Sequence, residues 1–478
     1  MAGTTGAPSL KGLGFLGVLG PGLAMAAAGV GAGDVTMPAF GAAQFGLALI
    51  WAPILAGVLK FALNESLARW QLATGETLVE GWALRLGPVV SYGFFVYLIV
   101  WSIPVFAALT STSGVTVHLL LPLGWISDSF SQPMFVGGPA LGNVTWSIVL
   151  VASAATLVWF GRYQLFEKVM SAMTVFMVVV VVGGACTLFP AAALSAQWSA
   201  GGWLPPKSLT LTFAILGGTG STVGVLAYGY WMRERRREGA EWLTVTRIDL
   251  GSCYLISAVF GVAVTLLVGG VSREEYAAIL EIPPAQLQDA PRLEHVFRVV
   301  AHRLEHEAGL GRASWLFLLA LAATTTSSLL GMLQSVPYFY ADLIALLRGA
   351  SPEIRRRMTS GSSAWYRSLL IALAALPSPL VAWKQPREIL ILYAVWGSLF
   401  MPFLAATLLV MNNRRAWMGG SANRRLSNAA LAACLAVFAW GAANTVHEYL
   451  LTEQTDKGRP LLGSVETHSW TRQTPRSG

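Results

Sequence analysis

Long apolar stretches recur from one end of this 478-residue chain to the other. Each is close to the length of about 20 residues that an α-helix needs to cross a lipid bilayer. Only 12% of the residues are charged, against roughly 25% in an ordinary soluble protein. That is too few to cover the surfaces of two or three soluble domains. Because lipid satisfies no backbone hydrogen bonds, the sequence predicts an all-α integral membrane protein.

The apolar stretches, bounded by turn-forming residues, predict eleven membrane-spanning helices. The spans are expected at residues 14–45, 47–70, 90–121, 144–160, 167–189, 209–231, 248–270, 313–346, 364–384, 387–411 and 427–449. They form one transmembrane domain over residues 12–449, between a short N-terminal tail (1–11) and a polar C-terminal tail (450–478). The first span lacks a signal-peptidase pattern, so we expect it to be retained.

Basic residues orient the chain in the membrane. With a cytoplasmic N-terminus, the short outer loops hold only Lys207, Lys384 and Arg387, while the arginine clusters at 233–237 and 355–357 lie in cytoplasmic loops. We therefore expect a multi-pass protein of the plasma (inner) membrane, and the net charge of +8 requires no nucleic-acid partner. The sequence contains no phosphate-binding loop, ATP motif or nucleophile–base pairing. We expect a transporter without a cofactor, not an enzyme.

Two units of five spans follow one another, at about 12–189 and 209–411, with an extra helix at about 427–449. An odd number of spans makes the second unit enter the membrane from the opposite side, which predicts a 5+5 inverted repeat. The first span of each unit, span one and span six, is interrupted by glycines. These are Gly29, Gly31 and Gly33 in span one, and Gly217, Gly218 and Gly220 in span six.

Glycine lets a helix unwind at such interruptions. Unwound backbone at membrane depth is tolerated only where it lines a cavity or binds a ligand. Freed N–H groups then favour anions, and freed carbonyls favour cations. An isolated glycine cluster would more simply let two helices pack closely. Two clusters at corresponding positions of two units instead predict a substrate site between spans one and six.

The residues around these breaks resemble a known family. The segments Gly20-Pro21-Gly22, Gly41-Ala42-Ala43-Gln44-Phe45-Gly46 and Leu72-Ala73-Thr74-Gly75-Glu76-Thr77-Leu78 are similar to those of the Nramp divalent-metal transporters. The similarity is free of gaps from Gly20 to about Trp82 and extends loosely over residues 12–415. It implies a LeuT-type fold of the amino-acid/polyamine/cation superfamily, with broken helices 1 and 6 and alternating access around a central site.

The site motifs of that family are changed here. Its Asp-Pro-Gly-Asn motif in span one reads Gly31-Ala32-Gly33-Asp34, and its Met-Pro-His motif in span six falls on Ser221-Thr222-Val223. A span-ten glutamine falls on Ala394, and the acidic residues of span three fall on Ala108 and Ser111. Serine is a hard oxygen ligand where a thioether would favour transition metals. The resemblance therefore implies a divergent relative without the standard proton coupling, as in the Nramp-related magnesium transporters.

Asp34 is the strongest candidate for a substrate or metal ligand, because a carboxylate at membrane depth is costly and usually functional. It could also cap the second half of span one, where an acidic residue suits a helix N-terminus. Lys60 in span two reaches a similar depth, counted at 1.5 Å per residue. It could pair with Asp34 and shift the site toward a neutral, zwitterionic or anionic substrate. Alternatively it extends to the cytoplasmic interface beside Glu65.

The remaining candidates surround the second break. Besides Gly31, Gly217 and Gly218, we expect Thr219, Ser221 and Thr222 to bind substrate, with Ser221 as a further metal ligand, although such hydroxyls often bond only to their own backbone. Tyr228, Tyr393 and Ala394 are expected around this group. The run Thr324 to Ser328 in span eight could line the same cavity or serve helix packing.

The outer loop at 271–312 contains an amphipathic helix. Its apolar stripe consists of Leu293, Val296, Phe297, Val300 and Leu304. His295, His302 and His306 fall together on the opposite face, where they could bind a metal or form an ordinary solvated surface.

Three functions fit these observations. The first is a secondary transporter that moves an inorganic, divalent cation across the bilayer by alternating access, through oxygen ligands. The second is a transporter of a small organic solute, such as an amino acid or a carboxylate. The third is a non-transporting membrane sensor, although the short cytoplasmic loops leave no signalling domain.

Overall fold

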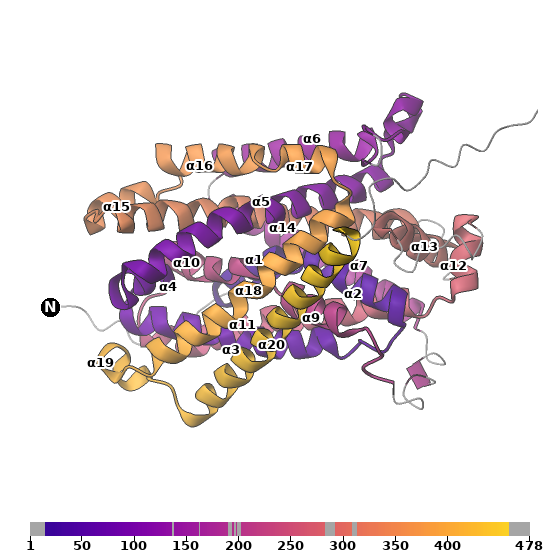
Figure 1. Ribbon diagram of the computed structural model, residues 1–478. Coiled ribbons are helices and arrows are strands. Elements are labelled where there is room, and N and C mark those ends of the chain that lie inside the picture. Colours follow the sequence, from indigo (N-terminus) through magenta and orange to yellow (C-terminus); the bar gives the residue numbers. More distant parts are fainter. Residues whose placement is uncertain are drawn as a thin grey trace, which may run out of the picture.

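A computed structural model describes residues 15–135, 138–161, 163–189, 194–195, 197, 202–282, 292–307 and 313–457 of the chain. These residues form an α-helical bundle (Figure 1). The N-terminal tail expected at 1–11 and the end of the C-terminal tail lie outside the described residues.

Every expected span coincides with a helix or an interrupted helix in the structure. The long helices are α3 (Ala52–Thr74), α5 (Pro88–Leu120), α6 (Leu141–Phe160), α7 (Tyr163–Thr187), α11 (Leu243–Gly269), α14 (Ala313–Leu347), α18 (Pro386–Asn412) and α20 (Arg425–Lys457). Span nine is divided into α16 (Ala364–Ala375) and α17 (Ser378–Trp383).

The number of spans differs from the sequence estimate. Within the described residues, nine helices are long and apolar enough to cross a membrane, or ten if a bent pair counts as one span. Helix α3 is long enough to cross but is not among them, because it carries Lys60, Asn64, Glu65 and Arg69 along its length. The total of eleven spans therefore stays a prediction.

Both helices expected to be broken are interrupted. Span one consists of α1 (Phe15–Gly29) and α2 (Ala32–Phe45), and the two axes from Pro21 onward meet at 44°. Span six consists of α9 (Leu209–Gly218), a 3-10 turn η4 (Val223–Leu226) and α10 (Ala227–Glu234). Gly220 and Ser221 between α9 and η4 both have φ of 71°. This left-handed conformation is easy for glycine and costly for serine, and it turns the chain out of the helix.

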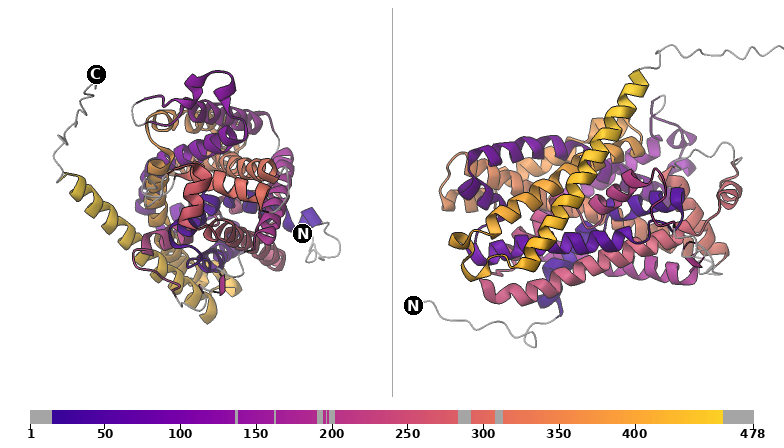
Figure 2. Two further views of the ribbon diagram at one scale, coloured as in Figure 1. Left: turned by 90° about the vertical axis from the view of Figure 1, so that its right-hand side faces the viewer. Right: turned by 60° about the horizontal axis from the view of Figure 1, so that its bottom comes forward.

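The two breaks lie in the centre of the bundle. Helix α1 packs against α11, α7 and α14, and α2 packs against α11 and α9. Helices α6, α16 and α17 form an outer layer beside α5 and α14 (Figure 1). Helix α20 runs along α18 and then extends away from the body of the bundle (Figure 2).

Short helices mark the two ends of the bundle (Figure 1). One end carries α4 (Leu78–Gly81), α15 (Pro352–Met358) and α19 (Arg415–Met418), and we name it the α4/α15 end. The other carries α12 (Arg273–Leu280) and α13 (Leu293–His306), and we name it the α12/α13 end. The orientation predicted from basic residues puts the α4/α15 end in the cytoplasm.

Helix α13 is the amphipathic helix expected in the outer loop, and all five residues of its apolar stripe are buried. On its other face the rings of His302 and His306 stack with centroids 4.1 Å apart. No group of three or more His, Cys, Asp or Glu side chains suited to a metal ion occurs in the described part of the chain. The histidine face therefore gains no support as a metal site.

Candidate functional site

Hydroxyl groups from α14 satisfy the carbonyl oxygens freed at the first break. Ser327 Oγ donates to the carbonyl oxygen of Ala27 at 2.8 Å, and Ser328 Oγ donates to that of Ala28 at 2.6 Å. A Cβ on Gly31 would overlap Ser328 Oγ and Cβ. The glycine therefore allows α14 to approach the break closely, and neutral donors replace the lost helical hydrogen bonds.

An ammonium group satisfies the carbonyls of the second break. Lys60 on α3 is fully buried, and its Nζ donates to the carbonyl oxygen of Gly217 at 2.9 Å and to that of Ser221. The interpretation that Lys60 extends to the interface beside Glu65 is therefore wrong. The lysine is drawn inward because the unwound carbonyls need donors that lipid does not supply.

Asp34 joins the two breaks. It is fully buried in the first turn of α2. Its two carboxylate oxygens both accept a hydrogen bond from the Gly220 N–H, each at 3.1 Å from the Gly220 nitrogen. The residue at the N-cap of α2 is Gly31, and no side chain caps that helix. Asp34 therefore stabilises the backbone of the other broken span. Among the described ion pairs, none joins Asp34 to Lys60 within 4.0 Å, so the ion pair that the sequence analysis left open as one alternative is not formed in this state.

Two cavities adjoin the breaks. A small central cavity of about 20 Å³ lies between them, α5, α14 and α18. It is lined by Ala28, Gly29, Gly33, Val105, Leu109, Gly218, Ser221, Thr222, Ser328, Met332 and Tyr393. A larger outer cavity of about 280 Å³ extends along α2, α9 and α18 as far as Lys207 and Arg387. Arg387 also lies beside Leu293 of α13, so the outer cavity reaches the α12/α13 end.

Five of the eleven expected site residues line these cavities. Gly218, Thr222 and Tyr393 line both, Gly217 lines the outer one, and Ser221 lines the central one. Gly31 and Asp34 support the breaks from the side through the contacts described above. The side chain of Ala394 lies outside the described residues.

Thr219 is buried at the second break, and its hydroxyl has no hydrogen-bond partner among the described residues. It is therefore a donor available at the site.

Tyr228 does not take the place expected for it. It is absent from the described linings of both cavities, and its hydroxyl donates to Asp249 Oδ2 at 2.9 Å. Asp249 on α11 also accepts from Arg237 at 2.7 Å and from the Gly22 N–H at 2.9 Å. Tyr228 thus belongs to a buried ionic network that holds α1, α10 and α11 together. The sequence signal for this network was an aspartate inside an apolar span.

Met332 is a cavity residue that the sequence analysis missed. It lies one helical turn after Ser328 on α14, so both side chains share a face. Its Sδ and Ser221 Oγ are both among the atoms nearest to a Cβ built on Gly224. A thioether therefore reaches the second break from α14, although position 221 itself carries a serine.

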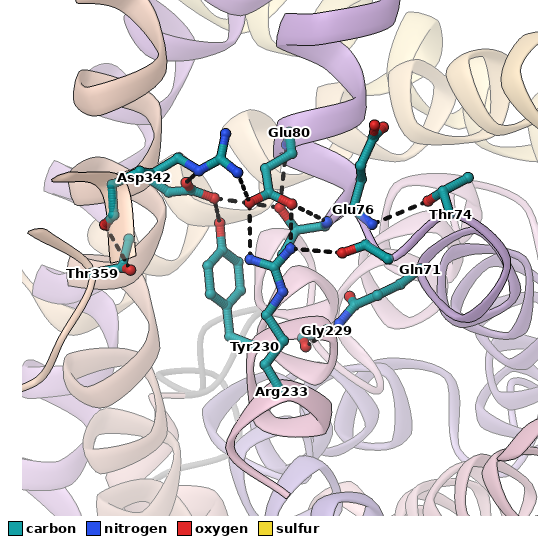
Figure 3. Close-up of polar contacts among 12 residues, drawn as sticks. Gln71, Thr74, Glu76, Glu80, Gly229, Tyr230, Arg233, Asp342 and Thr359 are labelled. Atoms are coloured by element: carbon teal, nitrogen blue, oxygen red, sulfur yellow. Dashed lines mark hydrogen bonds and ion pairs between the residues drawn. The ribbon is translucent and has the colours of Figure 1, made fainter. Parts of the chain in front are cut away.

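A charged cluster closes the α4/α15 end (Figure 3). Glu80 of α4 pairs with Arg233 at the end of α10 and with Arg355 of α15 at 3.0 Å. Asp342 of α14 accepts from Tyr230 of α10 at 2.7 Å and pairs with Arg355 at 3.6 Å. The residues of α10 from Ala227 to Met232 are buried behind this cluster.

The site is thus reached from one end and closed at the other. The outer cavity leads from the α12/α13 end to the breaks, and the Glu80 cluster ties α10 to α4, α14 and α15 at the opposite end. On α5, Ala108 and Ser111 are buried and carry no carboxylate.

Comparison with known proteins agrees with this architecture. Residues 22–448 match the family model described as natural resistance-associated macrophage protein-like, Nramp. The chain is similar to the divalent metal cation transporter MntH of Mycobacterium tuberculosis, 24% identical over 428 residues that cover 85% of this chain and 86% of the relative. The MntH of Mycobacterium leprae is 24% identical over 421 residues with the same coverage.

Solved structures share the fold. The manganese transporter of Eremococcus coleocola, in complex with an aromatic bis-isothiourea compound, superimposes with a TM-score of 0.60 at 16% identity, over 95% of this chain and 94% of that one. MhsT in complex with L-phenylalanine gives a TM-score of 0.51 at 15% identity, over 88% and 98%. The predicted LeuT-type fold is confirmed by these likenesses. With the family model spanning most of its length, the chain is a multi-pass membrane protein that belongs to the Nramp family.

Proposed function

We propose that this protein is a secondary transporter that carries a divalent metal cation across the membrane by alternating access. The observation that carries the proposal is the meeting of both broken helices at one cavity, with Asp34 bridging from the first break to Gly220 in the second. The family membership supports it, because relatives such as the mycobacterial MntH proteins bear the name of divalent metal cation transporters.

The groups at the breaks that could bind the cation are mainly oxygen ligands. Asp34 is the one carboxylate in the break segments 29–34 and 217–222. It lies behind the described cavity linings with both oxygens on the Gly220 N–H, so it binds the cation only once that contact opens. The hydroxyls of Ser221 and Thr222 line the central cavity, and Thr219 is buried beside them. Oxygen ligands suit hard cations that keep part of their hydration shell. The thioether of Met332 adds a soft group to the cavity wall, so transition metals keep one favourable contact. The carboxylates associated with proton movement are replaced by Ala108 and Ser111, and the transport is therefore not driven by the family's usual proton route.

The α4/α15 end is the cytoplasmic end in this proposal, and the outer cavity faces outside. The charge of the short loops supports that orientation. The Glu80 cluster then acts as the inner gate, which has to open before the cargo leaves toward the cytoplasm.

A second candidate is transport of a small organic solute with a carboxylate. The basic side chains of Lys207 and Arg387 line the outer cavity, and no acidic side chain lines either cavity among the described residues. Purified protein in liposomes separates the two candidates. Quenching of an internal metal-sensitive dye by external Mn²⁺ supports metal transport, whereas uptake of labelled amino acids or dicarboxylates without quenching supports the organic solute.

A further inference from the structure

The side-chain amine of Lys60 lies at the centre of the site. Its Nζ contacts the carbonyl oxygens of Gly217 and Ser221, and carbonyl oxygens of this kind are ligands that hard cations take. We propose that the Lys60 ammonium is a built-in cation, which occupies the carbonyl oxygens of the second break and has to be displaced by the transported cation. Lys60 thereby determines how tightly the site binds cations. This inference rests on the proposed transport of metal.

The side chain is held in place along its length. A Cβ on Gly220 would lie 3.8 Å from Lys60 Cγ and 2.9 Å from Tyr254 Cε1, so the lysine stem runs in the space between the break and α11. One turn further along α3, Asn64 donates to the Tyr254 hydroxyl at 2.9 Å. The ammonium therefore reaches the carbonyls by a packed route from α3.

The first break shows that a charge is not needed to satisfy freed carbonyls. There the neutral hydroxyls of Ser327 and Ser328 donate to Ala27 and Ala28. A buried ammonium is far more costly than a hydroxyl, so its presence at the second break indicates a role beyond hydrogen bonding.

The balance of charge at the two breaks indicates what this additional role of Lys60 is. When both groups are ionised, Asp34 and Lys60 contribute one charge of each sign, and the break segments 29–34 and 217–222 hold no other ionisable side chain. A divalent cation that entered beside Lys60 would leave two uncompensated positive charges in a buried site. A cation that displaces Lys60 as the neutral amine, with the proton released to water in the outer cavity, instead leaves one net positive charge and gains two carbonyl ligands.

A purely structural role is the alternative. Gly217 lies in the last turn of α9, and a cation at a helix C-terminus stabilises the helix through its dipole. In that case, replacement of Lys60 lowers thermal stability and leaves the affinity for metal unchanged or reduced. The two roles therefore differ in the sign of the change in affinity.

The test is isothermal titration of Mn²⁺ into purified full-length protein, wild type against Lys60→Gln, whose amide still donates to a carbonyl. We expect Lys60→Gln to bind at least tenfold more tightly. Lys60→Met provides a second neutral variant should the first not fold, and Lys60→Arg, which keeps the charge, is expected to stay near wild type. Arg69→Gln is the matched control, because it removes a buried positive charge from the same helix about 13 Å away along its axis.

The outcomes separate this inference from the proposed function. Tighter binding by the neutral variants supports it. Binding by those variants where the wild type shows none would contradict both metal transport and the inference, because no cation would then displace Lys60 in the natural protein. Equal or weaker binding by the neutral variants, with a wild type that does bind, overturns the inference alone. Absence of binding in every variant overturns both.

Discussion

The Ser328 hydroxyl occupies the space that a side chain on Gly31 would need. The same hydroxyl donates to the carbonyl oxygen of Ala28 at 2.6 Å. Helix α14 therefore packs directly against the backbone of the first break. The φ of Gly31 is −142°, a value open to other residues. The lack of space for a Cβ beside Ser328 therefore requires a glycine at this position.

Gly31→Ala is expected to destabilise the folded protein. The added methyl group forces Ser328 and the break apart, and overpacking of this kind costs about 1–3 kcal/mol. The midpoint of thermal unfolding, measured by fluorescence-detected size exclusion, should fall by several degrees. Gly217→Ala is the control, because a Cβ there meets no atom within 4 Å. Equal midpoints for the two variants would show that the contact with Ser328 does not exist.

Met332→Leu is expected to change the preference among metals. Leucine keeps the volume of the side chain and removes the thioether, which is a ligand for soft cations. Binding of Cd²⁺ should weaken by about tenfold, or ~1.4 kcal/mol, while binding of Mg²⁺ stays within about twofold of the wild type. Isothermal titration of both metals gives the ratio directly. An equal loss for both metals would mean that Met332 serves packing alone.

Glu80→Gln is expected to open the α4/α15 end. Neutralisation of Glu80 removes an ionic partner of both Arg233 and Arg355, so α10 loses its ion pair with α4 while Arg355 keeps Asp342. Labelling by an impermeant maleimide of a cysteine introduced at Met232, which is buried on α10, should become faster from the cytoplasmic side.

Glu76→Gln is the control for that experiment. Glu76 pairs with Arg85 at 2.7 Å in the same region, where Arg85 is 37% exposed, and such surface pairs contribute about 0–1 kcal/mol. Labelling at residue 232 should stay at the wild-type rate. If labelling at residue 232 is no faster in Glu80→Gln than in Glu76→Gln, the Glu80 cluster does not act as the inner gate.

The fold was open to prediction from the sequence, and the position of the substrate site stays a prediction. Apolar length located the long helices, and the glycines at 29–33 and 217–220 coincide with the interruptions between α1 and α2 and between α9 and η4. Local patterns suffice for these features because each depends on residues close together in the chain.

The partners of the site residues were not open to prediction in the same way. Depth counting brought Lys60 to the level of Asp34, but its amine contacts carbonyls 157 and 161 residues away in the chain. The direction in which the Lys60 side chain leaves α3 decides whether it contacts Asp34 or these carbonyls. That direction cannot be derived from the composition of the helix. Met332 could have been predicted from the sequence, because it lies one helical turn after Ser328 on the same face of an expected helix.

Titration of purified protein with Mg²⁺, Mn²⁺ and Ca²⁺, wild type against Asp34→Ala, tests the central claim most directly. The wild type should bind at least one of these cations, and Asp34→Ala should lose that binding, because the variant removes the one carboxylate of the break segments. Binding unchanged in Asp34→Ala, or no binding by the wild type, would contradict a divalent-cation site at the two breaks.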